Sequence, residues 1–274
     1  RREPARGAKP WLATTACALP VLLGFVVPVS TIAWHAFDHL GQWVEPSFWR
    51  AFLHTGALAL TTAGIACLVG LFMAYGARSS RSNAPRVLAQ ATSLGYAAPG
   101  AVVAVGVLIP LAAFDNWLAD GVEAATGYDI GLLLTGSAAA IVFAYVVRFV
   151  VIAHGAIDGA LGRITPSMEL AARTLGSGRG TVLRRIHVPM IRGSVLTAAL
   201  LVFVDASKEL PATLILRPFN FETLATTVYN AASLENLAEA GPAALAIIVL
   251  GLLPVTILGR ALNRSRPGEE GQLS

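Results

Sequence analysis

Long apolar stretches, separated by short charged or turn-rich segments, dominate the chain. Each stretch runs for about 20 residues or more, the length of a helix that crosses a bilayer, whereas a barrel strand needs only about 10. Because only helices and closed barrels satisfy all backbone donors and acceptors in hydrocarbon, stretches of this length predict helices. The expected spans are residues 11–34, 52–76, 87–114, 130–153, 193–216 and 242–262. The pattern therefore predicts an all-α, polytopic membrane protein with six transmembrane helices.

Composition and charge support a membrane location. Of the 274 residues, 55% are apolar and 13% are charged, whereas a soluble domain carries about 25% charged residues. The net charge is +4, but the basic residues concentrate at the N-terminus and after the second, fourth and sixth expected spans. Under the positive-inside rule, this distribution places both termini in the cytoplasm and implies no nucleic-acid partner.

The two ends of the chain are polar. Residues 1–10 form a basic segment that begins with Arg instead of Met, and residues 265–274 form a tail; both are expected to be cytoplasmic and to flank a membrane domain at 11–264. The first apolar stretch is longer than the roughly 7 to 15 residues of a signal-peptide core, so it predicts an anchor. The basic start suggests a piece of a longer polypeptide or a processed chain.

The longest connection, residues 154–192, lies between the fourth and fifth expected spans on the cytoplasmic side. It holds no apolar cluster able to fold alone, so a partner is expected. Thr165-Pro166 is typical of a helix start, because Thr can cap free amides and Pro suits the first turn. A short helix is expected over 167–175, ended by Gly176.

At these residues the chain resembles the permeases of binding-protein-dependent importers. Their coupling loop reads Glu-Ala-Ala, three residues, Gly, nine residues, Ile, one residue, Leu-Pro. The positions in register here are Ala171, Ala172, Gly176, Ile186 and Pro189. Leu170 occupies the family's Glu position, the acid lies one residue earlier at Glu169, and Val188 replaces Leu.

The resemblance implies a type I ABC importer permease (MetI-like) fold in a bacterial inner membrane. It implies that the short helix lodges in a cleft of a cytoplasmic ABC ATPase dimer and transmits its closure to the spans. The implied further partners are a second permease half, homologous or fused, and a periplasmic substrate-binding protein, besides membrane lipid. ATP and Mg would bind the partner ATPase, so neither a cofactor nor enzymatic activity is expected of this chain.

Three ionisable residues interrupt the fifth expected span. Asp205 precedes Lys208 by three residues and Glu209 by four, so one helical face is expected to carry all three. Pro211 cannot donate to the Ser207 carbonyl, which leaves a polar group beside them. Asp205, Lys208, Glu209 and Pro211 could line or gate the translocation path, or form an interhelical salt bridge that fixes packing. Both interpretations remain open.

The segments 208–221, 224–229 and 237–240 resemble ferric-iron importer permeases, in particular their carboxy-terminal half. Permeases for thiamine, sulfate, polyamines and phosphonates share the same fold and loop, so these substrates are alternatives. A secondary transporter would explain the charged span but not the long cytoplasmic loop.

No metal or nucleotide site is predicted in the chain itself. His35 and His39 have a spacing that could clip a metal on one helical face, but their place at a span boundary favours exposed polar groups. The glycine-rich run 176–180 lacks the preceding strand and the following Gly-Lys-Ser/Thr of a phosphate loop. Intramembrane enzymes are disfavoured because neither Gly-x-Ser-x-Gly nor His-Glu-x-x-His occurs.

Overall fold

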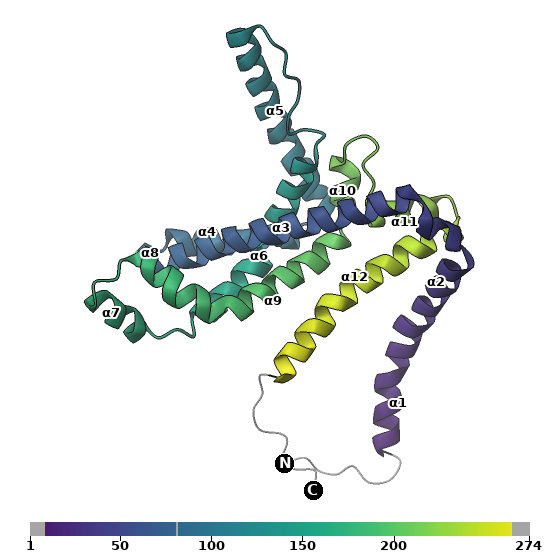
Figure 1. Cartoon of the computed structure of the whole chain (residues 1–274), viewed down its shortest axis with the longest axis horizontal. Helices are drawn as coiled ribbons and strands as arrows, with labels where there is room; N and C mark the ends of the chain where they lie inside the picture. The colour runs from purple at the N-terminus through teal and green to yellow at the C-terminus, as the bar shows by residue number, and fades with distance from the viewer. Residues whose placement is uncertain (1–8, 81, 265–274) are drawn as a thin grey trace.

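The computed structural model describes residues 9–80 and 82–264, and every regular element in these ranges is helical (Figure 1). The expected segments 1–10 and 265–274 therefore lie largely or wholly outside the described residues. The elements are α1 (Lys9–Val21), η1 (Leu22–Val26), α2 (Val27–Asp38), η2 (Leu40–Val44), α3 (Pro46–Ser79), α4 (Ala84–Ala97), α5 (Gly100–Thr126), α6 (Ala138–Leu161), α7 (Pro166–Thr174), α8 (Arg179–Val182), η3 (Leu183–His187), α9 (Val188–Ser207), α10 (Pro211–Leu216), α11 (Leu224–Ser233) and α12 (Leu237–Arg264).

Six helical segments are long and apolar enough to cross a membrane, which agrees with the predicted number. They are Trp11–Asp38, Pro46–Ser79, Gly100–Thr126, Ala138–Leu161, Gly180–Ser207 and Leu237–Ile257. Three of the predicted spans nevertheless differ from the helices observed. The third and fourth are shifted toward the C-terminus, and the fifth is interrupted.

The third predicted span, 87–114, contains a break in the helix. α4 ends at Ala97 and α5 begins at Gly100. Ala98 is extended, with ψ 141°, because a residue before proline is disfavoured in the helical region, and Pro99 follows it. The membrane-crossing helix is therefore α5, and α4 is a separate helix packed against α6.

The fourth predicted span, 130–153, begins in a loop, and its helix starts only at Ala138. Asp115 of α5 holds this loop. Its carboxylate accepts backbone N–H bonds from Leu133, Leu134 and Thr135 at 3.0, 2.9 and 2.7 Å, and the residue is 1% exposed. A buried carboxylate that accepts three backbone amides holds this loop in place.

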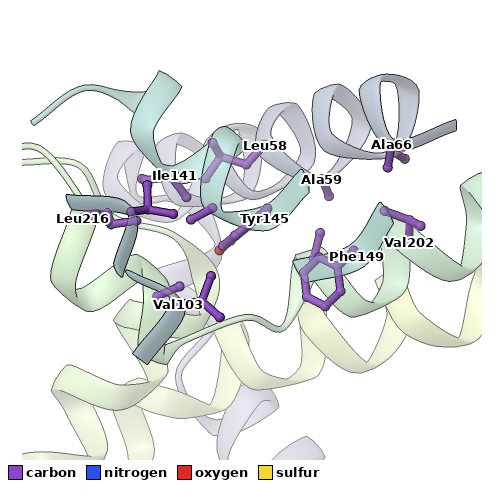
Figure 2. Packing of buried hydrophobic residues seen from close by; sticks show 14 of the residues in the cluster. Leu58, Ala59, Ala66, Val103, Ile141, Tyr145, Phe149, Val202 and Leu216 are labelled. Carbon is purple, nitrogen blue, oxygen red and sulfur yellow. The ribbon is translucent and has the colours of Figure 1, made fainter. Parts of the chain in front are cut away.

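The core lies where α3, α6 and α9 pack side by side, with the start of α5 and α10 against them. Figure 2 shows members of this core from three helices: Leu58 of α3, Tyr145 of α6 and Val202 of α9. Many of the buried positions are alanines with at most 1% exposure: Ala59, Ala66, Ala144, Ala153 and Ala198. Small side chains let helices approach closely, which is the main source of helix association where lipid replaces water.

A second group pairs α2 with α12 at the side of this core (Figure 1). At Gly241 of α12, an added Cβ would lie 2.7 Å from the Ala36 nitrogen, so glycine is needed for this approach. The first span buries none of its most apolar window inside the chain. Such an apolar surface suits lipid or another membrane subunit.

The closest approach of α3 to α6 generates a stability prediction. A Cβ at Gly70 would lie 2.9 Å from the His154 nitrogen and 3.1 Å from the Ala153 carbonyl carbon, whereas Gly64 on the same helix has nothing within 4 Å. Gly70→Val should therefore destabilise the fold by about 1 to 3 kcal/mol through overpacking. Gly64→Ala should be neutral or stabilising by about 0.5 to 1 kcal/mol. Thermal unfolding in detergent measures both, and a midpoint for Gly70→Val equal to that of Gly64→Ala would contradict the packing described.

Candidate functional site

The short helix of the loop 154–192 forms where the sequence predicts it. α7 begins at Pro166, and the Met168 amide donates to the Thr165 carbonyl at 3.2 Å. Beyond its end Gly176 has φ +82°, and the Ser177 amide donates back to the Ala172 carbonyl at 3.0 Å. This is the six-to-one bond of a Schellman motif, whose left-handed position favours glycine. The positive φ of this position explains why the helix ends at a glycine, as the sequence predicts.

The apolar side chains of α7, and Leu175 just beyond its end, are largely uncovered by the other described residues. Leu170 is 59% exposed, Met168 41% and Leu175 85%, and Ala171 is also exposed. α7 lies at one extremity of the bundle, joined to it through α8 (Figure 1). Its nine residues make a helix about 14 Å long. An apolar patch on a short, projecting helix is typical of a protein-binding surface.

Glu169 anchors α7 to the ends of neighbouring helices. Arg78, in the last turn of α3, donates through Nε to Glu169 Oε1 at 2.6 Å. Its two terminal nitrogens donate to the Leu161 and Ile164 carbonyls, both at 2.8 Å. One guanidinium therefore binds the carbonyls at the end of α6 and the carboxylate of α7 together, a use suited to the fork geometry of arginine. His187 Nε2 also lies 3.0 Å from Glu169 Oε1 and is 1% exposed.

The shifted acid of the loop thereby acquires a structural explanation. Glu169 turns toward the spans, while Leu170, at the family's Glu position, turns outward. Neither Arg78 nor His187 was singled out from the sequence. The available signal was the position of Arg78 at the cytoplasmic end of a span, close in the predicted topology to the loop acid.

Ile186 and Pro189 lie in the joint between the loop and α9. The π-helical turn η3 precedes α9, with the Val188 amide donating to the Leu183 carbonyl. Pro189 follows directly and has no N–H, so it cannot continue the ordinary ladder from the residues before it. Ile186 is half-buried at this wider turn. The two predicted positions thus mark a change of helix geometry.

The prediction that Asp205, Lys208 and Glu209 share one helical face is wrong. α9 ends at Ser207 and α10 begins at Pro211, because the proline has no N–H to extend the helix. Lys208 Nζ lies 2.9 Å from Asp205 Oδ1 in a local pair whose lysine is 59% exposed. Glu209 does not take part in this pair.

Glu209 lies in the break itself and pairs with α6. Its side chain is 8% exposed, and Oε1 is 3.4 Å from Arg148 Nη1. The hydroxyls of Tyr145 and Thr213 contact each other and donate to the Glu209 carbonyl, at 3.1 and 2.7 Å. The hydroxyls thus satisfy a carbonyl at the break that a continuous helix would have bonded to a backbone amide.

Arg148 is the one residue of this ion pair that is not among the site residues predicted from the sequence. A lone Arg inside an expected span, 130–153, is costly unless it pairs with an acid at similar depth. That rule would have matched it with one of the acids of the fifth span. The structure thus brings Arg148 and Glu209 together and separates them from Asp205 and Lys208.

The histidine pair does not form a metal clip. α2 ends at Asp38, and His39 lies beyond it, so His35 and His39 do not share a helical face. Instead, His39 Nδ1 lies 3.8 Å from Asp38 Oδ2. Within the described residues, no group of three or more His, Cys, Asp or Glu side chains could hold a metal ion.

Comparisons of sequence relate the chain to transport permeases, although no protein-family model matches it. It is 30% identical over 118 residues to the Fe(3+)-transport system permease protein FbpB 2 of Haemophilus influenzae, covering 43% of this chain and 23% of that protein. The match thus spans under a quarter of that relative. The chain is also 21% identical over 227 residues to the putative 2-aminoethylphosphonate transport system permease protein PhnV of Salmonella typhimurium, covering 83% and 80%.

Solved structures show the same fold. A bacterial ABC transporter involved in the import of the acidic polysaccharide alginate matches with a TM-score of 0.70 and 15% identity, over 94% of this chain and 97% of that one. The inward-facing MetNI methionine ABC transporter matches with a TM-score of 0.57 and 16% identity, over 80% and 98%. The predicted all-α, six-span fold of type I importer permeases and the resemblance to ABC permeases are confirmed.

The anchor of α7 generates a second prediction. Glu169→Gln keeps the size of the side chain but removes the charge that faces Arg78 and His187. Loss of this half-exposed pair should cost about 1 kcal/mol of local stability, so amides of α7 should exchange about fivefold faster. Hydrogen exchange with mass spectrometry measures this effect. Arg184→Gln, an exposed change in the same loop, serves as control, and equal exchange in both variants would refute the anchor.

Proposed function

We propose that this chain is the transmembrane permease subunit of an ATP-driven importer, forming half of a translocation pore in a bacterial inner membrane. The observation that carries the proposal is α7, which has an anchored acidic side and an uncovered apolar side. A helix with these two sides can receive a push from a cytoplasmic partner and pass it to the spans. A secondary transporter would have no use for such a surface.

The proposed partners follow from the surfaces of the chain. A cytoplasmic ABC ATPase dimer would take α7 in a cleft and would itself bind and hydrolyse ATP with Mg, so the permease is not an enzyme. A second permease half, homologous or fused, would cover apolar spans that are exposed in this chain, such as the first. A periplasmic substrate-binding protein would deliver the solute. In this proposal both termini lie in the cytoplasm, as the distribution of basic residues predicts.

The coupling residues in this proposal act in two groups. Ala171, Ala172 and Gly176 shape the docking helix, and the small side chains let a partner approach its backbone. Glu169 anchors that helix to α3 and α6. Ile186 and Pro189 lie in the joint through which movement reaches α9.

Substitution on the uncovered side of α7 tests the coupling proposal. Ala171→Glu places a charge among the exposed small and apolar side chains of α7 and should weaken association with the ATPase of the same gene neighbourhood by about tenfold or more, because the charge loses its hydration on docking. Co-purification and ATP-dependent uptake measure the effect. Ser167→Glu, in the first turn of the same helix, is the control because a negative charge suits a helix N-terminus.

Deletion of 166–176 gives the stronger form of this test. Intact ATPase association and uptake after both the deletion and Ala171→Glu would show that α7 does not couple the two proteins. Uptake that continues without any ATPase would favour a secondary transporter.

Ferric iron is the proposed substrate, with 2-aminoethylphosphonate as the alternative. The similarity to FbpB 2 and the resemblance in 208–240 favour iron, while the similarity to PhnV spans more of this chain. On the side of the bundle remote from α7, a cavity of about 620 Å³ is lined by Glu45, Glu222 and Glu239 and by Arg50, and Glu222 is paired with Arg217. Carboxylate oxygens in excess suit a hard cation better than an anionic solute.

Uptake by the reconstituted assembly distinguishes the two substrates. Proteoliposomes that contain both permease halves, the ATPase and its periplasmic binding protein should accumulate radiolabelled ferric iron in an ATP-dependent manner. Glu239→Gln should lower this uptake several-fold, because it removes one of the carboxylates that line this cavity. Accumulation of labelled 2-aminoethylphosphonate, with none of iron, would replace the proposed substrate and leave the permease assignment intact.

A further inference from the structure

Two separate helix interruptions meet at one ion pair. The first is at Pro99, between α4 and α5, and the second is at 208–210, between α9 and α10. Glu209 belongs to the second interruption. Gly100, the first residue after the other, leaves no room for a Cβ, because Arg148 Nη1 and Glu209 Oε1 occupy that space. Element ends are where helical proteins absorb changes of backbone angle.

An ion pair at this position contributes little stability if its role is packing alone. It is surrounded by the apolar core of α3, α5, α6 and α9, and a buried pair is often no more stabilising than apolar side chains of similar size. Arg148 Nε is buried and has no hydrogen-bond partner among the described residues, so this arrangement leaves the guanidinium incompletely satisfied. Charges differ from apolar groups in one useful respect, since they regain hydration when they separate into water.

Each half of the pair is connected to the anchor of α7. α6 carries Arg148 and ends at Leu161, whose carbonyl is held by Arg78 beside Glu169. α9 leads from His187, 3.0 Å from the same carboxylate, to the break that contains Glu209. Helices α6 and α9 therefore run from the anchor at Glu169 to the two partners of the ion pair. A displacement of α7 reaches both sides of it.

We infer that the Arg148–Glu209 pair is a latch that holds the two helix breaks together in this conformation and separates in each transport cycle. Arg148 is thus a positioning residue of the transport machinery and not a solute ligand. The inference rests on the proposed permease function. It places the conformational change at the breaks near Pro99 and Pro211 and leaves the helices around them rigid.

Reversible cross-linking tests whether the pair must separate. Arg148→Cys and Glu209→Cys are combined in a chain whose native cysteines, Cys17 and Cys67, are replaced by Ala. A short bis-methanethiosulfonate then joins the two thiols in the assembled transporter, and dithiothreitol releases them. The latch predicts that joining lowers uptake at least about tenfold and that reduction restores it. Single-cysteine chains treated with the same reagent are the controls. Uptake within twofold of the unjoined chain would overturn the latch.

ATP hydrolysis by a less severe variant provides the second measurement. Glu209→Gln keeps the side-chain shape and removes the charge, so the conformation held by the latch loses stability. ATP hydrolysis without the binding protein should therefore rise about fivefold or more. Asp158→Asn, an exposed change on the same helix as Arg148, is the control. Unchanged hydrolysis in Glu209→Gln would reduce the pair to static packing. Failure of the unsubstituted chain to assemble with an ATPase or to transport would instead refute the proposed function.

Discussion

Every backbone polar group in a membrane must find a partner inside the protein, and this requirement shapes the chain at each level. Where a helix is continuous, its own ladder meets the requirement. Where Pro211 ends α9, the Glu209 carbonyl is taken by the hydroxyls of Tyr145 and Thr213. Where the chain leaves α5, the carboxylate of Asp115 collects three loop amides. The irregular segments are tolerated because polar side chains from neighbouring elements serve them.

Close packing of small residues makes these arrangements possible. Alanines and glycines along α3, α6 and α9 bring the helices near enough for side chains on one to reach the backbone of another. Gly70 against Ala153 and Gly100 against the Arg148–Glu209 pair are two examples. A larger residue at either position would separate elements that have to cooperate. Close packing of the helices is thus what allows buried backbone polar groups to find side-chain partners in this bundle.

The end of the bundle that carries α7 is organised differently, because part of its surface remains uncovered. Glu169, Arg78 and His187 tie α7 to the ends of α3, α6 and α9, while Leu170 and Leu175 stay exposed. This division explains how a helix of nine residues, too short to be stable alone, keeps its shape before a partner binds. The same ends lead along two helices to the buried ion pair at the breaks.

The amino-acid sequence by itself determined the helical class, the number of spans, and the short helix in the long loop after the fourth span, because these depend on local properties: run length and the signals of Thr165, Pro166 and Gly176. It also indicated the permease resemblance. The tertiary structure decided the partners of the charges. Spacing along the chain placed Glu209 with Asp205 and Lys208, yet a proline broke the helix, and the acid found Arg148 on another span. Likewise, the bond between Glu169 and Arg78 joins residues 91 positions apart, a proximity that only the packing of whole helices can create.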